Sequence, residues 1–440
     1  MKLKGVTAMV VGLGASGIAA ARFLGARGAE LVLTDRRSDL DRTSLPRGKV
    51  CLGDHNPGWL DGVELVVSSP GVPRDTVLLR EAVARGIRVI GEVELAARFI
   101  SAPIAAVTGT NGKSTVTVML GEMLKRDGRR VFVGGNLGTP LIEAVQGAYD
   151  AIAAEISSFQ LEWIEAFRPH VGVHLNLTDD HLDRYRDLED YGRAKARLFE
   201  NQGSGDWAIL NRDDPNVWKL AGEVRAQVIA FGLSRPQSTS AIWAAERALE
   251  FAINDLGGRI SLGHFRLPGR HNLANAMAAA AAALVMGCNP GAVELALADF
   301  QPLAHRIELV REQGGITWID DSKGTNVGAV VEALEAVSAP VILIAGGVDK
   351  GGDYAPLIEP LRRKVRRAIL IGAARHRIAA AVSGAVEVEL VVTLREAVER
   401  AARIARRGDT VLLSPACSSF DQFRDYAERG SVFKELVRAL

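Results

Sequence analysis

Short apolar runs rich in β-branched residues alternate with longer amphipathic runs along the 440 residues of the chain. The short runs predict strands and the longer ones predict helices. Three strand-like runs lead into glycine-rich or polar turns, at residues 8–17, 104–115 and 341–352. This alternation predicts an α/β fold with mostly parallel sheets, whose ligands lie at the carboxyl ends of the strands. Residues 232–268 alternate apolar and polar positions around glycines and predict hairpins.

Two breaks in the pattern indicate domain boundaries. A helix-like stretch at 92–99 ends before Ser101-Ala102-Pro103, where a new strand begins, and an alanine-rich helix at 274–286 precedes the Gln301-Pro302 turn. A chain of this length holds about three domains. We therefore expect domains at residues 1–100, 101–301 and 302–440.

The strongest local signal is the turn Thr-Gly-Thr-Asn-Gly-Lys-Ser-Thr at 108–115, between a strand-like and a helical run. A glycine-rich turn at a helix N-terminus directs backbone N–H groups at a phosphate. Its lysine places a cation near the β- and γ-phosphates, and its serine hydroxyl can bind Mg²⁺. A tight turn with an incidental lysine is the alternative, and Val107 departs from the regular Walker A pattern. ATP binding is favoured, through Gly109, Thr110, Asn111, Gly112, Lys113, Ser114 and Thr115.

A carboxylate, an imidazole and an amine follow that turn at Glu155, His181 and Lys195. Phosphoryl transfer needs metal ions, and a carboxylate with an imidazole can hold one. Mg²⁺ prefers oxygen ligands, so a single histidine is compatible but not diagnostic. Alternatively, Glu155 is a carboxylate at a helix start and Lys195 is a solvated surface residue. The sequence alone does not bring these residues together.

The turn Gly-Leu-Gly-Ala-Ser-Gly at 12–17 follows a strand, and Asp35 ends the next one. This pattern matches the dinucleotide-binding fingerprint, which any nucleotide diphosphate satisfies. Arg36 and Arg37 can add contacts to an anionic or planar group. The turn Ser-Ser-Pro-Gly at 68–71 ends another strand of the same domain. A plain strand–helix turn without a ligand is the alternative.

Four polar clusters follow strands in the C-terminal third, at residues 305–308, 320–326, 346–352 and 413–423. Their lysines and hydroxyls suit a small anionic substrate. Each cluster by itself is also compatible with a turn that carries solvated charges.

Composition and charge narrow the class of protein. Hydrophobic residues make up 48% and charged residues 24%, as in ordinary globular proteins. The net charge of +1 gives no reason to expect a nucleic acid or membrane surface as partner. The three cysteines fit no metal or disulfide spacing and suit a reducing cytosol. The N-terminus is typical of a buried strand rather than a signal peptide. We therefore expect a cytoplasmic protein.

Taken in order, these segments resemble the Mur ligase family, which adds amino acids to the growing peptidoglycan precursor. The resemblance covers essentially the whole chain. It implies a Rossmann-like N-terminal domain for a UDP substrate, a central P-loop-type ATPase domain with a mainly parallel sheet, and a Rossmann-like C-terminal domain for the amino acid. Its most specific pieces are Gly-Thr-Asn-Gly-Lys-Ser-Thr, Glu-Ile-Ser-Ser-Phe-Gln-Leu-Glu, His-Leu-Asp-Arg-Tyr, Asp-Ser-Lys-Gly-Thr-Asn and Leu-Ser-Pro-Ala-Cys-Ser-Ser-Phe-Asp-Gln-Phe.

Within the family, the Pro-Ala-Cys-Ser-Ser run and the absence of an Asp-Asn-Pro-Arg segment favour one reaction. The resemblance implies an ATP-dependent ligase that adds D-glutamate to UDP-N-acetylmuramoyl-L-alanine through an acyl phosphate. A monomer is expected, whose C-terminal domain closes over the ATP.

The resemblance also implies roles for individual residues. Lys113 and Ser114 would hold ATP phosphates and a first Mg²⁺, and Glu155 and His181 a second. Lys195 matches the family's carbamylated lysine, and carbamylation would turn its amine into an oxygen ligand. Adenosine contacts would come from Asn275, Arg306 and Asp321, UDP contacts from Ser16, Asp35, Arg36, Arg37, Ser69 and Gly71, a sugar-peptide contact from Asn136, and D-glutamate contacts from Thr325, Lys350, Ser419 and Tyr426.

The chain departs from the family pattern at Tyr426, where phenylalanine is expected, and at Gly324, where alanine is common. Three other functions stay open. A folylpolyglutamate synthase-like ligase shares the ATP apparatus but is not expected to carry the complete N-terminal glycine-rich domain. An NAD-dependent oxidoreductase would bind NAD and release no phosphate. A non-catalytic nucleotide-binding regulator would bind ATP without amine-dependent ADP production.

Overall fold

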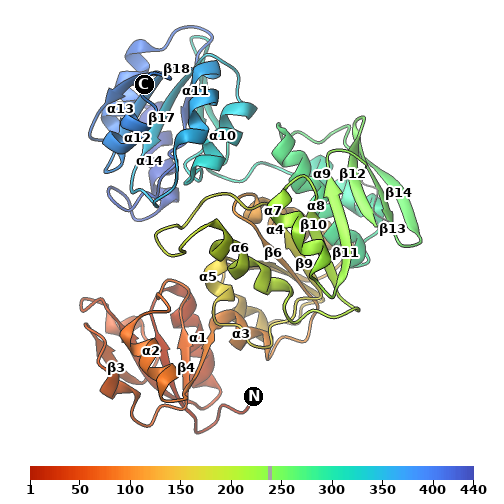
Figure 1. Ribbon diagram of the computed structural model, residues 1–440, viewed down its shortest axis with the longest axis vertical. Helices are drawn as coiled ribbons and strands as arrows, with labels where there is room; N and C mark the ends of the chain where they lie inside the picture. The colour runs from red at the N-terminus through yellow and green to blue at the C-terminus, as the bar shows by residue number, and fades with distance from the viewer. Residues whose placement is uncertain (236–239) are drawn as a thin grey trace. The chain divides into compact units, whose positions relative to one another are not determined.

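The computed structural model describes residues 1–235 and 240–440, and its contacts divide the chain into two compact units. Figure 1 shows the ribbon from the N-terminal sheet in red to the C-terminal sheet in blue. The first unit consists of Met1–Asn176, Gly192–Phe265 and Ala274–Asp299, and the second of Leu177–Tyr191, Arg266–Leu273 and Phe300–Leu440. The first unit holds two sheets and the second holds one.

The N-terminal sheet has five parallel strands in the order β3-β2-β1-β4-β5. Its strands are β1 Thr7–Val11, β2 Glu30–Asp35, β3 Lys49–Leu52, β4 Leu65–Ser68 and β5 Arg88–Gly91, and its helices are α1 Ala15–Ala26, α2 Val77–Ala84 and α3 Glu92–Ala97. The strands are apolar almost throughout because a parallel sheet is covered on both faces. The predicted α/β fold with a parallel sheet is confirmed for this region.

The central sheet has nine strands in the order β14-β13-β12-β11-β10-β9-β6-β8-β7. They are β6 Ile104–Thr108, β7 Val131–Gly135, β8 Ala151–Glu155, β9 Val171–His174, β10 Trp207–Asn211, β11 Gln227–Gly232, β12 Ala241–Ala245, β13 Ala248–Ile253 and β14 Leu256–Ser261. The strands β12, β13 and β14 pair antiparallel, which confirms the predicted hairpins, although residues 236–239 of that segment lie outside the described residues. The other pairs are parallel.

The helices of this region are α4 Lys113–Arg126, α5 Ser158–Leu161, α6 Leu188–Ala196, α7 Pro215–Trp218, α8 Arg270–Val285 and α9 Pro290–Asp299. Helix α4 begins at Lys113, three residues before the helical run expected at 116, because the left-handed Gly112 forms its N-cap. The alanine-rich helix expected at 274–286 lies within α8, and its alanines are buried. Among the described residues, none of the helices combines the length and the apolar character needed to cross a membrane.

The C-terminal sheet has six strands in the order β15-β16-β20-β17-β18-β19, with only β15 antiparallel to its neighbour. They are β15 Glu308–Gln313, β16 Ile316–Asp320, β17 Val341–Gly346, β18 Val365–Ile371, β19 Glu387–Leu390 and β20 Thr410–Leu413, with helices α10 Val327–Ala336, α11 Ile358–Lys364, α12 Arg375–Ala381, α13 Leu394–Ile404 and α14 Tyr426–Arg438. Successive side chains of β17 point to opposite faces of the sheet. Each face is covered by its own cluster of buried apolar side chains. The mainly parallel α/β prediction is confirmed here as well.

Candidate active site

The glycine-lysine loop joins β6 to α4, and two of its positions require glycine. Gly109 and Gly112 have φ angles of +149° and +83°, which side-chain-bearing residues rarely adopt. A Cβ atom on Gly112 would lie 2.4 Å from Asn275 Oδ1, and one on Gly109 would lie 2.9 Å from Leu175 Cβ. The loop therefore packs directly against the ends of α8 and β9.

The loop backbone is further fixed by Asn176, the residue that follows β9 by two positions. The N–H of Thr110 donates to the Asn176 carbonyl oxygen (3.0 Å), and the N–H of Asn111 donates to its side-chain oxygen Oδ1 (2.8 Å). Helix α4 begins directly after this braced turn, and the first N–H groups of a helix have no partner within it. The loop thus has the form of a phosphate-binding helix N-terminus.

Two lysines converge on one carbonyl oxygen of this loop. Lys113 Nζ lies 2.9 Å from the Gly109 oxygen and 2.8 Å from that of Thr110, and Lys195 Nζ lies 2.8 Å from the same Gly109 oxygen. Lys195 is only 1% exposed, so its interpretation as a solvated surface residue is wrong. The Lys113 ammonium at a helix N-terminus favours a polyanionic ligand.

Glu155 is the last residue of β8 and is 3% exposed. Its alternative interpretation, a carboxylate at a helix start, is wrong because α5 begins three residues later. Strand register places it opposite Val107, next to the loop, and its Oε1 accepts a hydrogen bond from Asn136 Nδ2 (2.7 Å). The structure therefore brings Asn136 and Glu155 together at the carboxyl edge of the sheet.

The residues present fit a magnesium nucleotide. The side chain of Ser114 is buried on the first turn of α4, which Gly112 holds against Asn275. The hydroxyl of Ser114 and the carboxylate of Glu155 supply the oxygen ligands that Mg²⁺ prefers. Thr115 is buried beside Ser114.

His174 was missed by the sequence reasoning. It ends β9 opposite Thr108 of β6 and is 1% exposed. Burial, with smaller contributions from Lys195 and Lys113, lowers the pKa of His174 to about 3, so the imidazole is neutral. In the sequence it stands among apolar strand residues, and its position at a carboxyl strand end was the only available signal.

The N-terminal glycine turn is organised around Asp35, at the end of β2. Asp35 accepts hydrogen bonds from the backbone N–H of Leu13 (2.7 Å) and from Arg37 Nη2 (2.9 Å). Burial raises the pKa of Asp35, but the hydrogen bonds from Arg37 and Leu13 outweigh it and lower the pKa to about 2. The ionised carboxylate thus braces its own glycine turn.

Other residues assigned to the UDP group surround that turn. Ser69 Oγ donates to the Gly12 carbonyl oxygen (2.6 Å), and a Cβ on Gly17 would lie 1.9 Å from the same oxygen. Ser16 is half-buried on the first turn of α1, whereas Arg36 and Gly71 are exposed.

In the second unit, Lys350 contacts both Asp180 and Thr325, which is also assigned to D-glutamate. Lys350 Nζ lies 3.1 Å from Asp180 Oδ1 and 3.4 Å from Thr325 Oγ1, and Asn326 Nδ2 donates to Asp180 Oδ2 (3.1 Å). Burial raises the pKa of Asp180, but Lys350 draws it below its ordinary value. His181 follows with a φ of +56° and places Nε2 3.7 Å from Asp180 Oδ2. Sequence reasoning missed Asp180, although it adjoins His181.

Asp321, assigned to the adenosine contacts, is buried and accepts a hydrogen bond from Ser414 Oγ (2.7 Å). Burial raises the pKa of Asp321 to about 7, against the opposing effects of Ser414 and Arg306. Gly324 stands where alanine is common in the family. An alanine would not fit here without a shift, because its Cβ would lie 2.4 Å from Asp321 Oδ2.

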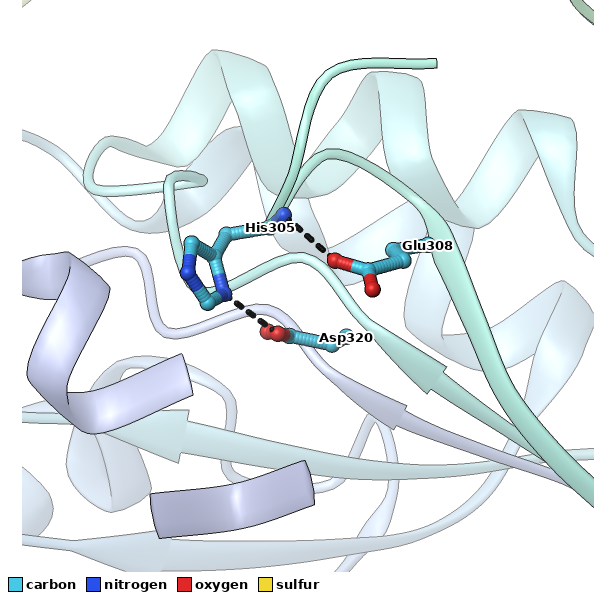
Figure 2. Close-up of side chains that lie close together, drawn as sticks. All are labelled: His305, Glu308 and Asp320. Atoms are coloured by element: carbon cyan, nitrogen blue, oxygen red, sulfur yellow. Dashed lines mark hydrogen bonds and ion pairs between the residues drawn. The ribbon is translucent and has the colours of Figure 1, made fainter. Parts of the chain in front are cut away.

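Arg306, a second adenosine candidate, lies between two residues with left-handed backbone, His305 (φ +62°) and Ile307 (φ +48°). Figure 2 shows how the neighbouring side chains hold this segment. His305 Nδ1 lies 2.6 Å from Asp320 Oδ2, and the His305 N–H donates to Glu308 Oε2 (2.9 Å).

The spacing of His305, Glu308 and Asp320 also suits a metal ion, because their ligand atoms lie within 4.8 Å of one another. However, Lys434 Nζ lies 3.0 Å from both carboxylate oxygens of Glu308. An ammonium group at this position opposes a second cation, so we assign the cluster to bracing the backbone around Arg306.

Tyr426 begins α14 and contacts Lys323, another residue that the sequence reasoning did not assign. Lys323 Nζ lies 3.1 Å from the Tyr426 hydroxyl and 4.7 Å from the centre of its ring. The hydroxyl that distinguishes this residue from phenylalanine therefore has a partner. Ser419, also assigned to D-glutamate, is buried.

The predicted residues thus fall into two groups. The first unit brings together Lys113, Lys195 and Gly109, places Asn275 beside Gly112, and pairs Asn136 with Glu155. The second unit brings together His181, Thr325 and Lys350 around Asp180.

Three family models match the chain. They are the Mur ligase MurD-like N-terminal domain at residues 6–91, the Mur ligase middle domain at 107–283, and the Mur ligase glutamate ligase domain at 305–417. The chain is 46% identical to the UDP-N-acetylmuramoylalanine–D-glutamate ligase of Geotalea uraniireducens, over 100% of this chain and 99% of that protein. It is 45% identical to the protein of the same name from Pelobacter propionicus, over 100% of both.

Solved structures share the fold. The pseudomurein peptide ligase type C of Methanothermus fervidus matches with a TM-score of 0.63 at 20% identity, over 98% of this chain and 99% of that one. The UDP-N-acetylmuramate-alanine ligase MurC of Thermotoga maritima matches with a TM-score of 0.60 at 18% identity, over the same shares. With all three family models matched in order and full-length relatives above 40% identity, the chain belongs to the Mur ligase family.

Proposed function

We propose that the chain joins D-glutamate to UDP-N-acetylmuramoyl-L-alanine, with ATP converted to ADP and phosphate. The observation that carries the proposal is the position of Lys113, whose Nζ lies on the carbonyl oxygens of Gly109 and Thr110 at a helix N-terminus shaped for phosphate. The choice of substrates rests on the full-length likeness to ligases of that name.

The first step activates a carboxylate, which is by itself a poor acyl donor. The terminal alanine carboxylate of the UDP-sugar attacks the γ-phosphate of ATP, giving an acyl phosphate and ADP. Lys113 and the first N–H groups of α4 offset the negative charge that develops on the phosphoryl oxygens. Two Mg²⁺ ions would supply further charge neutralisation, the first held by Ser114 and the second by Glu155, His181 and Lys195.

In the second step, the amine of D-glutamate attacks the acyl phosphate, and the tetrahedral intermediate expels phosphate. Lys350, with Thr325, Ser419 and Tyr426, would hold the carboxylates of D-glutamate. Asp180 keeps the Lys350 ammonium in place through its 3.1 Å contact. Closure of the C-terminal domain over the nucleotide would exclude water from the acyl phosphate.

The remaining substrate contacts are those that the resemblance to the Mur ligase family implies. The UDP group would lie at the N-terminal turn with Ser16, Asp35, Arg36, Arg37, Ser69 and Gly71, the adenosine with Asn275, Arg306 and Asp321, and the sugar-peptide end near Asn136.

We further propose that Lys195 is carbamylated. A cationic lysine would be costly to bury and cannot ligate a metal, whereas a carbamate offers two anionic oxygens. The proposal also includes domain boundaries after residues 100 and 301. It includes a monomeric state, a cytoplasmic location and no nucleic-acid or membrane partner.

A phosphate-release assay with UDP-N-acetylmuramoyl-L-alanine, MgATP and a panel of amino acids tests the reaction. Release should depend on D-glutamate and should be stoichiometric with an amide product identified by mass. Equal release with every amino acid, or none with D-glutamate, would contradict the assignment. Binding of NAD with hydride transfer would instead support an oxidoreductase.

A further inference from the structure

His174 and Thr108 end two neighbouring strands of the central sheet. They are register partners in parallel strands, so their side chains point to the same face. Gly172 shares that face, because it lies two residues before His174 in β9. A Cβ on Gly172 would lie 2.7 Å from Phe199 Cε1.

The helical segment that contains Phe199 covers the face of the sheet to which His174 points. Phe199 belongs to the 3₁₀ helix Arg197–Phe199, which directly continues α6. Lys195 lies in the last turn of α6, and its Nζ reaches the carbonyl of Gly109, the residue that follows Thr108. The His174 ring therefore points to the side of the sheet from which Lys195 approaches the loop.

The polar atoms on this face have no partner of their own. Within the described part of the chain, both ring nitrogens of His174 and the Thr108 hydroxyl are buried without a hydrogen bond. Buried polar groups of native proteins are almost always paired, so three such atoms at one strand edge require an explanation. A metal ligand or a charged modification nearby would provide one.

We propose that His174 is a positioning residue that hydrogen-bonds a carbamate on Lys195. The inference rests on the proposed carbamylation of Lys195. In that reaction the neutral amine attacks the carbon of CO₂, an N–C bond forms, and one C=O electron pair moves to oxygen. The proton lost from nitrogen goes to solvent.

The geometry suits this product. The carbamate nitrogen keeps one N–H, which can retain the 2.8 Å hydrogen bond of Nζ to the Gly109 oxygen. A neutral imidazole has one N–H to donate to a carbamate oxygen. The carbamate would then give the donor nitrogen of His174 the partner that it lacks.

The test measures the carbamate itself. Protein equilibrated with ¹³C-bicarbonate and Mg²⁺, without nucleotide, is examined by ¹³C NMR for the carbamate signal. His174→Leu keeps a similar volume and removes both nitrogens, so carbamate occupancy at a fixed CO₂ concentration should fall about ten-fold or more. His174→Gln, which keeps a donor and an acceptor, should restore most of it.

The matched control is Val173→Ala, a buried neighbour on the opposite face of β9. It should lower the melting temperature without changing carbamate occupancy. Equal occupancy in His174→Leu and the unmodified chain overturns the inference, and so does an equal loss in Val173→Ala. Absence of any carbamate in the unmodified chain overturns both the inference and the carbamylation. A His174-dependent carbamate without D-glutamate ligation would contradict only the proposed function.

Discussion

The two glycine turns of the first unit share a backbone design and differ in the charge placed behind it. Each follows a buried parallel strand, contains a glycine in the left-handed region (Gly12 at +86° and Gly112 at +83°), and leads into a helix. Behind the N-terminal turn lies the ionised carboxylate of Asp35, bound to the Leu13 N–H. Behind the central turn lie Lys113 and Lys195.

The two turns therefore share a backbone shape and differ in side-chain charge. Each leads into a helix N-terminus, a geometry that is typical of phosphate binding. A carboxylate near the turn repels additional negative charge and accepts hydrogen bonds from hydroxyl groups, as a ribose requires. The Lys113 ammonium beside the central turn instead favours the more highly charged triphosphate. Substitutions at each turn test whether the two turns bind different ligands.

The largest effect is expected from Lys113→Ala. Loss of the cation at the transferring phosphate should lower the rate of ADP formation about a thousand-fold or more while the fold is kept. Phosphate release and circular dichroism measure the two properties. Lys125→Ala is the matched control, an exposed lysine on the same helix that pairs with Glu122. Most of the activity surviving in Lys113→Ala would refute the assignment of the loop.

Lys195→Ala should lower activity about a hundred-fold, because a metal ligand or its support is lost. Added short carboxylates such as formate or acetate should partly restore it by supplying the missing oxygen ligand. Lys113→Ala, measured beside it, should show no such regain. If carboxylates also leave Lys195→Ala inactive, carbamylation is contradicted.

A pair of glycine substitutions tests directly whether the two turns bind different substrates. Gly12→Ala and Gly112→Ala each impose left-handed strain of about 1–2 kcal/mol. Each also crowds a neighbouring side chain, because the added Cβ would lie 2.7 Å from Val72 Cγ2 at Gly12 and 2.4 Å from Asn275 Oδ1 at Gly112. Gly112→Ala should raise the KM for ATP about ten-fold, and Gly12→Ala should raise the KM for the UDP substrate instead. If both variants raise the same KM, the two turns do not serve different ligands.

The smallest effect concerns Asp35. Its pKa is lowered to about 2, so its stabilising effect is complete above the unfolded value near 4 and is lost as the pH falls towards 2. Asp35→Asn should therefore lower the free energy of unfolding by about 1–2 kcal/mol at pH 7. Urea unfolding should show the difference from the unmodified chain shrinking below pH 4. A constant difference between pH 7 and pH 3 would contradict an ionised, hydrogen-bonded carboxylate.

Much of the fold could be predicted because its signals are local. Strand-like runs, glycines and the lysine of the central turn lie within a few residues of one another, so periodicity and turn chemistry identify them. The glycine-lysine loop and its helix could therefore be located from the sequence, although the start of α4 at Lys113 depended on the left-handed Gly112.

The site was harder to predict because its partners are far apart in the chain. Asp180 meets Lys350 across 170 positions, and Lys195 meets Gly109 across 86. No periodic pattern encodes such pairs, since they follow from strand order and from the length of the connecting segments. His174 was missed because a histidine in an apolar strand has no distinguishing local pattern.

The sequence by itself determined the α/β class, the glycine-lysine turn and, through the resemblance, the family. Only the tertiary structure decided that Lys195 is buried on the glycine-lysine loop rather than solvated, that Glu155 ends a strand, and that the His174 ring lacks a hydrogen-bond partner among the described residues. The physical reason is that local conformational preferences act over a few residues. Burial and pairing of charges, by contrast, depend on which strands become neighbours.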